Sequence, residues 1–242
     1  MEAILNFDLA IFTFFQTYLM NPVLNVIMWV ITHLGDDGIF FIILGLVMIC
    51  FKKTRKAGVV ALGALLVMTI LNNEILKPII ERPRPYNLTR LPEATKEVLE
   101  YTEGKKDLDW VGFFGKIDWS IDRFPGLAER WDAGYSFPEV IDRMKPTSLS
   151  FPSGHTSSAF TFAMAITMVL KNKWAAIGSF VFAFLMGVSR IYVGVHYPTD
   201  VIMGAVVGIL YAVIGYFIFS KLYEAVYPKI EAAIANKKAK KA

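Results

Sequence analysis

The feature of this sequence that most constrains its fold is a series of long apolar runs. A helix that crosses the hydrocarbon core of a bilayer needs about 20 mostly apolar residues. Five stretches meet or approach this length: 38–51, 57–76, 154–170, 174–193 and 201–220. A sixth apolar stretch, 22–34, is shorter. Only 19% of the residues are charged, against ~25% in soluble domains. The chain is therefore predicted to be one integral membrane domain.

Composition argues against two other classes of protein. The single cysteine, Cys50, cannot form an intrachain disulfide, so a disulfide-stapled secreted scaffold is excluded. A net charge of +4 would suit a nucleic-acid-binding protein, but the basic residues cluster beside apolar runs, which is typical of membrane proteins. We expect the bilayer as a partner, no nucleic acid, and no obligate protein partner.

The basic loops predict the orientation of the chain. Lysines and arginines gather at 52–56, at 171–173 and in the tail at 237–241. Since cytoplasmic loops carry an excess of positive charge, this pattern fits about six transmembrane helices with both termini cytoplasmic, in the cytoplasmic membrane. The extracytoplasmic face then receives Asp36, Asp37 and the loop around His196.

Two further segments complete the predicted domain organisation. Residues 1–21 are interpreted as an interfacial helix, with Asp8 off its polar face; whether residues 3–20 span or lie on the membrane stays open. Residues 86–150 contain twelve acidic and nine basic residues and no possible span. They predict an extracytoplasmic cap inserted between the third and fourth helices of an all-α, polytopic membrane bundle. The catalytic core is expected at 22–85 and 151–223, and a basic cytoplasmic tail at 224–242.

Charged residues beside apolar helices need a reason, because charge is expensive at membrane depth. Lys77 and Arg84 flank the proline-rich end of the third predicted span, and Arg190 lies near the end of the fifth. Snorkelling to the interface would explain each cation alone. Under the predicted orientation, however, all three face the same side of the membrane and suit an anion-binding site.

The segment FPSGHTSSAF at 151–160 adds a second anion-binding element on that side. Pro152, Ser153 and Gly154 are typical of a helix N-terminus, whose first N–H groups and positive dipole end attract anions. His155 then falls in the first turn. Alone, this is only a capping sequence.

A histidine and a carboxylate follow the fifth predicted span. His196 precedes Tyr197-Pro198, which predicts an extended chain and then a helix start. Asp200 is close enough in sequence to hydrogen-bond one imidazole nitrogen and fix the tautomer of the ring. The third histidine, His33, is interpreted as an interfacial residue.

Together these groups predict a site for a dianionic phosphoryl group. Three cations and oriented N–H groups would bind its oxygens. Two histidines, one of them backed by a carboxylate, would supply a nucleophile and an acid. The sequence has no cysteine cluster, no third histidine in place and no acidic cluster, so neither a metal nor another cofactor is expected.

In order and spacing, three segments resemble the signature of the type-2 phosphatidic acid phosphatase (PAP2) superfamily: Lys77-x6-Arg84-Pro85, Pro152-Ser153-Gly154-His155 and Ser189-Arg190-x5-His196-x3-Asp200. This superfamily of membrane lipid phosphatases includes undecaprenyl-diphosphate and phosphatidylglycerophosphate phosphatases. The resemblance covers the helical core and leaves out residues 86–150.

The resemblance implies a metal-independent lipid phosphatase acting on undecaprenyl diphosphate, phosphatidylglycerophosphate or phosphatidic acid. It implies that His196 becomes a phosphohistidine, that Asp200 orients it, and that His155 protonates the leaving oxygen and then activates water. The remaining signature residues would bind phosphate: Lys77, Arg84, Ser153, Gly154 and Arg190.

Three alternative functions follow from the same residues. A lipid phosphotransferase could use the same site, and the sequence does not exclude it. The vanadium haloperoxidases share the signature but are soluble, which six apolar spans disfavour. A transporter would explain charges within the membrane, but not their gathering at one face beside a histidine–carboxylate pair.

Overall fold

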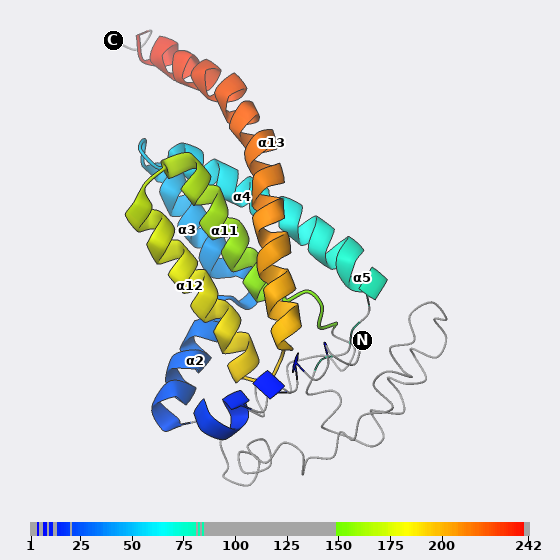
Figure 1. The fold of residues 1–242 in the computed structure, drawn as a ribbon. Coiled ribbons are helices and arrows are strands. Elements are labelled where there is room, and N and C mark those ends of the chain that lie inside the picture. Colours follow the sequence, from blue (N-terminus) through cyan, green and yellow to red (C-terminus); the bar gives the residue numbers. More distant parts are fainter. Residues whose placement is uncertain are drawn as a thin grey trace.

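The protein forms a bundle of helices in the computed structural model (Figure 1). The structure describes residues 21–80, Arg82, Arg84 and 149–239, with part of the segment from Ile4 to Leu19. Apart from Leu149 and Ser150, the predicted cap at 86–150 lies outside the described residues, as do the last three residues of the basic tail. The described part contains helices and turns and no strand, as the all-α prediction requires.

A helix forms at each of the six predicted positions. In chain order, the helices are α2 (Pro22–Leu34), α3 (Ile39–Cys50), α4 (Arg55–Thr69), α5 (Lys77–Ile80), α11 (Gly154–Leu170), α12 (Lys173–Tyr192) and α13 (Pro198–Ala239). Two π-helical segments, η1 (Phe15–Leu19) and η3 (Ile70–Leu76), and a 3₁₀ turn, η2 (Asp36–Gly38), complete the described elements. Through η3, α4 continues into α5 and ends before the prolines at 83 and 85, which cannot extend a helix.

Not every described helix is long and apolar enough to cross a membrane by itself. By length and apolarity, three rods of the described chain could cross a membrane: Arg55–Ile80, Lys173–Tyr192 and Pro198–Lys237. α2 and α3 qualify only together, as a pair bent by 48° around η2. α11 has 17 residues, slightly short of a full span. The expected count of six transmembrane helices is therefore not confirmed.

α11 lies at the centre of the bundle, where it contacts α4, α12 and α13. Glycines allow its close approach to α13: a methyl group on Gly204 would come within 2.9 Å of the Ser153 carbonyl oxygen, and one on Gly208 within 2.7 Å of the Ser157 carbonyl oxygen. The hydroxyl of Thr161 donates to the Gly208 carbonyl oxygen across the same contact. Small residues and interhelical hydrogen bonds are typical of helix packing in membranes.

The outer faces of the helices are apolar. Large exposed hydrophobic side chains cover α3, α12 and α13, including Ile43, Leu46, Val181, Phe184, Leu210 and Phe217. A bundle with small residues inside and large apolar residues outside is suited to a lipid environment. This pattern agrees with the prediction of an integral membrane protein.

The bundle has two chemically different ends. At the end that we call the site end, α5, the start of α11, the end of α12 and the start of α13 meet. The other end, called the basic end, holds the turns at 51–54 and 171–172 and the C-terminal half of α13. There the ammonium nitrogen of Lys56 lies 2.6 Å from Oε1 of Glu224 in α13. The predicted basic loops thus share one end, opposite the site end.

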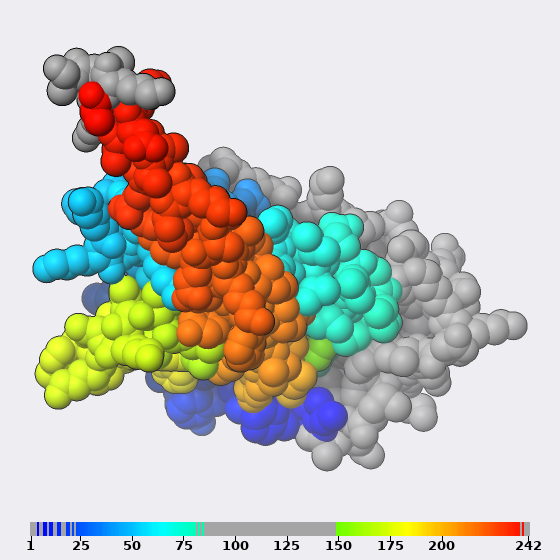
Figure 2. Space-filling view, turned by 90° about the horizontal axis from the view of Figure 1, so that it is seen from above, coloured from blue at the N-terminus to red at the C-terminus, as the bar shows by residue number. Residues whose placement is uncertain are grey.

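The prediction that both termini lie on one face is wrong. Asp8 bonds to Thr199 at the site end, whereas Glu224 lies at the basic end. The reason is the Gly35–Gly38 segment, which bends the chain by 48° and does not reverse it, so that α2 and α3 run on in one general direction. At the other terminus, α13 continues well past the rest of the bundle (Figure 1 and Figure 2).

Candidate active site

The three sequence motifs come together at the site end. The N–H of Ser153, before α11, donates to the carbonyl oxygen of Asp200 in α13 at 3.0 Å. A methyl group on Gly154 would lie 3.7 Å from the ammonium nitrogen of Lys77, so α5 reaches the start of α11. Segments more than 100 residues apart therefore form one site.

Ser153 and Gly154 form the N-terminus of α11. The buried Ser153 hydroxyl oxygen accepts hydrogen bonds from the N–H of Thr156, at 3.5 Å, and from its hydroxyl, at 2.9 Å. Ser153 thus acts as the N-cap of the helix, as the sequence predicts. The N–H groups of the first turn have no partner within an α-helix, and they present the positive end of its dipole.

His155 lies in that first turn and contacts the α2–α3 bend. Its Nε2 is 2.9 Å from Oδ1 of Asp36. The imidazole packs directly on Gly35, where an added methyl group would come within 2.5 Å of its Cδ2. Gly35 therefore leaves the space that the His155 ring occupies, and Asp36 gives this histidine a carboxylate partner that the sequence analysis did not assign.

His196 lies in the loop between α12 and α13 with only 1% of its surface exposed. Burial lowers the pKa of His196 well below its usual value. The positive charges of three neighbouring residues lower it further: Arg84, Arg190 and Lys77. The ring is consequently neutral near pH 7 and has a nitrogen lone pair available for attack.

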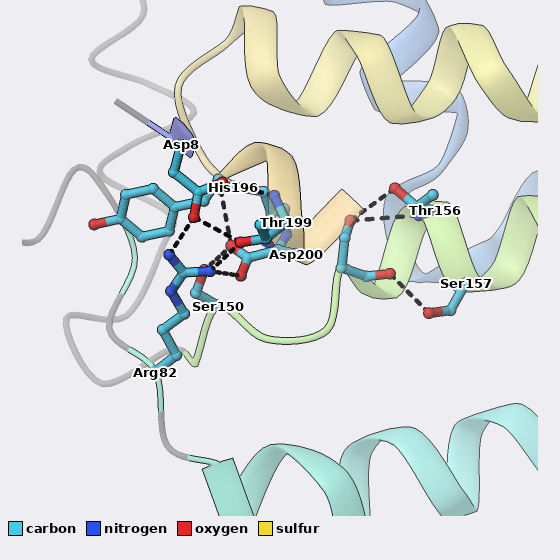
Figure 3. A network of polar contacts seen from close by, with 10 residues as sticks. Asp8, Arg82, Ser150, Thr156, Ser157, His196, Thr199 and Asp200 are labelled. Carbon is cyan, nitrogen blue, oxygen red and sulfur yellow. Dashed lines mark hydrogen bonds and ion pairs between the residues drawn. The ribbon is translucent and has the colours of Figure 1, made fainter. Parts of the chain in front are cut away.

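Asp200 lies beside His196 and is held by several donors. Its Oδ2 is 3.6 Å from the Nδ1 of His196, which is an ion-pair distance but longer than a hydrogen bond. The same carboxylate accepts hydrogen bonds from Arg82 Nη1 at 2.7 Å, from the N–H of Tyr197 at 2.8 Å, and from the hydroxyl of Ser150 (Figure 3). Its position is therefore set by three groups other than the histidine.

The predicted phosphate-binding cations surround this histidine. Arg190, 1% exposed in the last turn of α12, donates to the hydroxyl of Thr32 in α2. Lys77 begins α5, and Arg84 lies half-buried beyond that helix. The charges of Arg84 and Arg190 also act on His155, so the two histidines share one positively charged environment.

Sequence reasoning missed several residues of this site. Asp8 is fully buried and accepts hydrogen bonds from Arg82 and Thr199. Arg82 links it to Asp200. Two signals were present: Asp8 is a carboxylate off the polar face of an apolar segment, and Arg82-Pro83 duplicates the Arg84-Pro85 pair of the motif. Asp36 offered no comparable signal.

The described residues hold no group of three histidines, cysteines or carboxylates placed to share a metal ion. The carboxylates that lie near the histidines are instead paired with them or with Arg82. What the arrangement offers is a cluster of positive charge, a helix N-terminus and two histidines, each with an acidic partner. This combination can bind a phosphoryl group and transfer it to nitrogen.

Comparison with known proteins identifies the family of this chain. The profile of the PAP2 superfamily matches residues 57–224. An undecaprenyl-diphosphatase of Sulfolobus acidocaldarius is 25% identical over 86% of this chain and 76% of its own length. The undecaprenyl-diphosphatase BcrC of Bacillus subtilis is 40% identical over a matched region. This region covers 38% of this chain and 48% of BcrC, about half of that relative.

A solved structure has the same fold. The PAP2-type phosphatidylglycerolphosphate phosphatase of Bacillus subtilis superposes with a TM-score of 0.56 at 24% identity, covering 91% of this chain and 88% of that one. The family profile includes the start of α11 and the loop that carries His196, where the candidate site lies. The chain belongs to the PAP2 superfamily.

Proposed function

We propose that this chain, a membrane lipid phosphatase by family, hydrolyses a lipid phosphate or diphosphate through a phosphohistidine at His196. The observation that carries the proposal is the burial of His196 within reach of the positive charges of Lys77, Arg84 and Arg190. A neutral imidazole is a nucleophile, and the cations compensate the charge of the group that it attacks. A general base for His196 is therefore not required.

In the first step, the His196 nitrogen that faces away from Asp200 attacks phosphorus. A P–N bond forms, and the P–O bond to the lipid breaks. His155, protonated and paired with the Asp36 carboxylate, donates a proton to the leaving oxygen, so the lipid departs as an alcohol or as a lipid monophosphate. The Asp200 carboxylate stabilises the positive charge that develops on the His196 ring.

In the second step, His155 accepts a proton from water, and the resulting hydroxide attacks the phosphohistidine. The P–N bond breaks, inorganic phosphate leaves, and both histidines return to their starting states. The cations and the N–H groups at the start of α11 hold the non-bridging oxygens in both steps. They supply the charge neutralisation that Mg²⁺ provides in many phosphoryl transferases.

The substrate class follows from the position of the site. It lies at the end of a bundle whose outer faces are apolar, so a lipid can keep its tails in the bilayer while its phosphate reaches the cations. Relatives named as undecaprenyl-diphosphatase and as phosphatidylglycerophosphatase B support these two lipid classes. The basic loops lie at the opposite end, which supports an extracytoplasmic site in a cytoplasmic membrane.

The inserted segment 86–150 is proposed to select among lipids. The described residues on either side of it lie at the site, because the N–H of Ser150 donates to the carbonyl oxygen of Arg82 at 2.7 Å, and the Ser150 hydroxyl bonds to Asp200. A segment that begins and ends beside these residues is within reach of a bound substrate. Loops so placed act chiefly on binding and selectivity.

The test is phosphate release by the purified enzyme over a panel of undecaprenyl diphosphate, phosphatidylglycerophosphate and phosphatidic acid, with EDTA present. We expect turnover of at least one lipid to persist in excess chelator and to fall when vanadate is added, because vanadate adopts the five-coordinate geometry of the transition state. Activity that EDTA removes and Mg²⁺ restores would contradict the metal-free mechanism. A parallel reaction with an acceptor lipid separates hydrolysis from phosphotransfer.

A second expected result concerns Gly35. In the Gly35→Ala variant the added methyl group overlaps the His155 ring, and the ring must move. Because misplacing a catalytic group by about 1 Å can lower turnover up to 10²-fold, we expect kcat on a lipid substrate to fall with little change in KM. Gly178→Ala is the matched control, since a methyl group there meets nothing within 4 Å. Equal kcat values for the two variants would contradict the assigned position of His155.

A further inference from the structure

A chain of buried charges joins the N-terminal segment to the candidate nucleophile. Arg82 lies between two carboxylates, with Nη2 2.6 Å from Oδ2 of Asp8 and Nη1 2.7 Å from Oδ1 of Asp200. The three side chains are at most 4% exposed. Asp200 in turn lies beside His196. Figure 3 shows Asp8, Arg82 and Asp200 converging from the N-terminal segment, from the segment after α5, and from the start of α13.

Asp8 also caps the helix that carries Asp200. One of its carboxylate oxygens accepts from the N–H of Thr199 at 2.8 Å, and the other from the Thr199 hydroxyl at 2.6 Å. Thr199 is the second residue of α13, so its N–H has no partner within the helix. A carboxylate at this position also interacts favourably with the helix dipole. The N-terminal segment therefore fixes the first turn of α13, one residue before Asp200.

Arg82 makes contacts that fix its orientation. Its guanidinium lies 4.0 Å above the Tyr197 ring while it bridges the two carboxylates, and Nη1 also donates to the Thr199 hydroxyl at 2.7 Å. A planar guanidinium can bond to two carboxylates in fixed directions, whereas an ammonium group acts as a point charge. The direction of the Arg82 fork thus determines where the Asp200 carboxylate sits.

We propose that Asp8 and Arg82 are positioning residues for the transfer of phosphate to His196. Arg82 holds the Asp200 carboxylate beside the histidine ring. Asp8 holds both Arg82 and the first turn of α13. This inference rests on the proposed function, in which His196 is the nucleophile. Neither residue contacts the reacting atoms, so the N-terminal segment contributes to catalysis through the alignment of the His196–Asp200 pair.

The alternative is that these residues only stabilise the fold, as buried ion pairs often do. The two possibilities differ in their effect on the reaction. A purely structural role predicts that stability and activity fall together. A positioning role predicts a lower kcat in an enzyme that still folds and still binds the phosphate analogue vanadate at Lys77, Arg84 and Arg190.

The experiment compares Asp8→Asn, Arg82→Lys and the milder Thr199→Val in the full chain. We expect each to lower kcat, by about 10- to 100-fold for the two charged residues, with KM and the vanadate inhibition constant changed by less than about twofold. The loss should be the same for a lipid substrate and for an aryl phosphate with a good leaving group, because alignment of the nucleophile affects both. Controls at the basic end are Glu224→Gln, which removes the exposed ion pair with Lys56, and Arg55→Lys.

A double-mutant cycle tests whether Asp8 acts through Asp200. Once Asp200→Asn has removed the carboxylate, Asp8→Asn should lower kcat no further, since residues that act through one network are not additive. Melting temperature and vanadate inhibition check that each variant folds. If the Asp8 variant does not fold, Thr199→Val provides the same comparison without removing a charge.

Two results would overturn the inference while leaving the proposed function intact. In the first, Asp8→Asn and Arg82→Lys keep wild-type kcat while His196→Ala is inactive. In the second, kcat falls only in proportion to the loss of vanadate inhibition and melting temperature, as a structural role requires. A wild-type enzyme that releases no phosphate from any lipid would instead overturn the proposed function, and the inference with it.

Discussion

Replacing His196 with alanine is expected to abolish both phosphate release and the phosphoenzyme. The imidazole is buried and neutral, and it is surrounded by three cations. In the proposed mechanism no other group forms the bond to phosphorus. Turnover should fall by about four orders of magnitude or more, as is measured when the nucleophile of a catalytic triad is removed.

The measurement is single-turnover phosphate release, with an alkaline denaturing quench that preserves phosphohistidine, and identification of the labelled residue. Wild-type enzyme should carry an acid-labile phosphoryl group on His196, and His196→Ala should carry none. His33→Ala is the control, since His33 bonds through Nδ1 to the carbonyl oxygen of Trp29 and has no assigned role. A phosphoryl group trapped on His155 would reverse the assigned roles of the two histidines.

The residues of the three motifs could be located from the sequence because each lies at the end of an apolar helix. Lys77 follows one such run, His155 begins another, and His196 and Asp200 fall between two more. The basic loops join these helices at one end of the bundle. The helix ends that carry the motifs must therefore meet at the opposite end of the bundle. The structure places all these residues there, although their chemical roles stay predictions.

The supporting residues could not be located in this way, because their contacts join distant parts of the chain. Asp8 and Thr199 are 191 residues apart, Arg82 and Asp200 are 118 apart, and Asp36 and His155 are 119 apart. No periodicity or local spacing reports such pairs. A single buried carboxylate in an apolar segment indicates only that some partner exists.

The bend between α2 and α3 was missed for a local reason. Gly35-Asp36-Asp37-Gly38 falls between two of the six predicted spans, so the sequence predicts that the chain reverses its direction there. In the structure, Asp37 and Gly38 adopt positive φ values, 51° and 69°, around a 3₁₀ turn. The chain bends there by 48° and continues. This bend delivers Gly35 and Asp36 to His155, so the error in topology and the missed carboxylate have one cause.

His155→Ala is expected to separate the two chemical steps according to the leaving group. General acid assistance is worth about 10²–10⁴-fold, and the lipid alkoxide is a poor leaving group that needs it. With a lipid substrate the variant should therefore lose about this factor in phosphoryl transfer to His196. With an aryl phosphate, whose leaving group departs without a proton, the first step should be largely retained.

Removal of water activation should then make the phosphohistidine accumulate. Rapid mixing of His155→Ala with an aryl phosphate should give a burst of aryl alcohol equal to the enzyme concentration, followed by slow turnover.

Asp36→Asn should show the same pattern more weakly, because it removes only the carboxylate 2.9 Å from the His155 ring. Asp37→Asn serves as the matched control: Asp37 is the adjacent, exposed carboxylate, and asparagine tolerates its positive φ. Equal losses for the lipid and the aryl ester, without a burst, would mean that His155 does not protonate the leaving group. The cations and the helix N-terminus alone would then have to stabilise the departing oxygen.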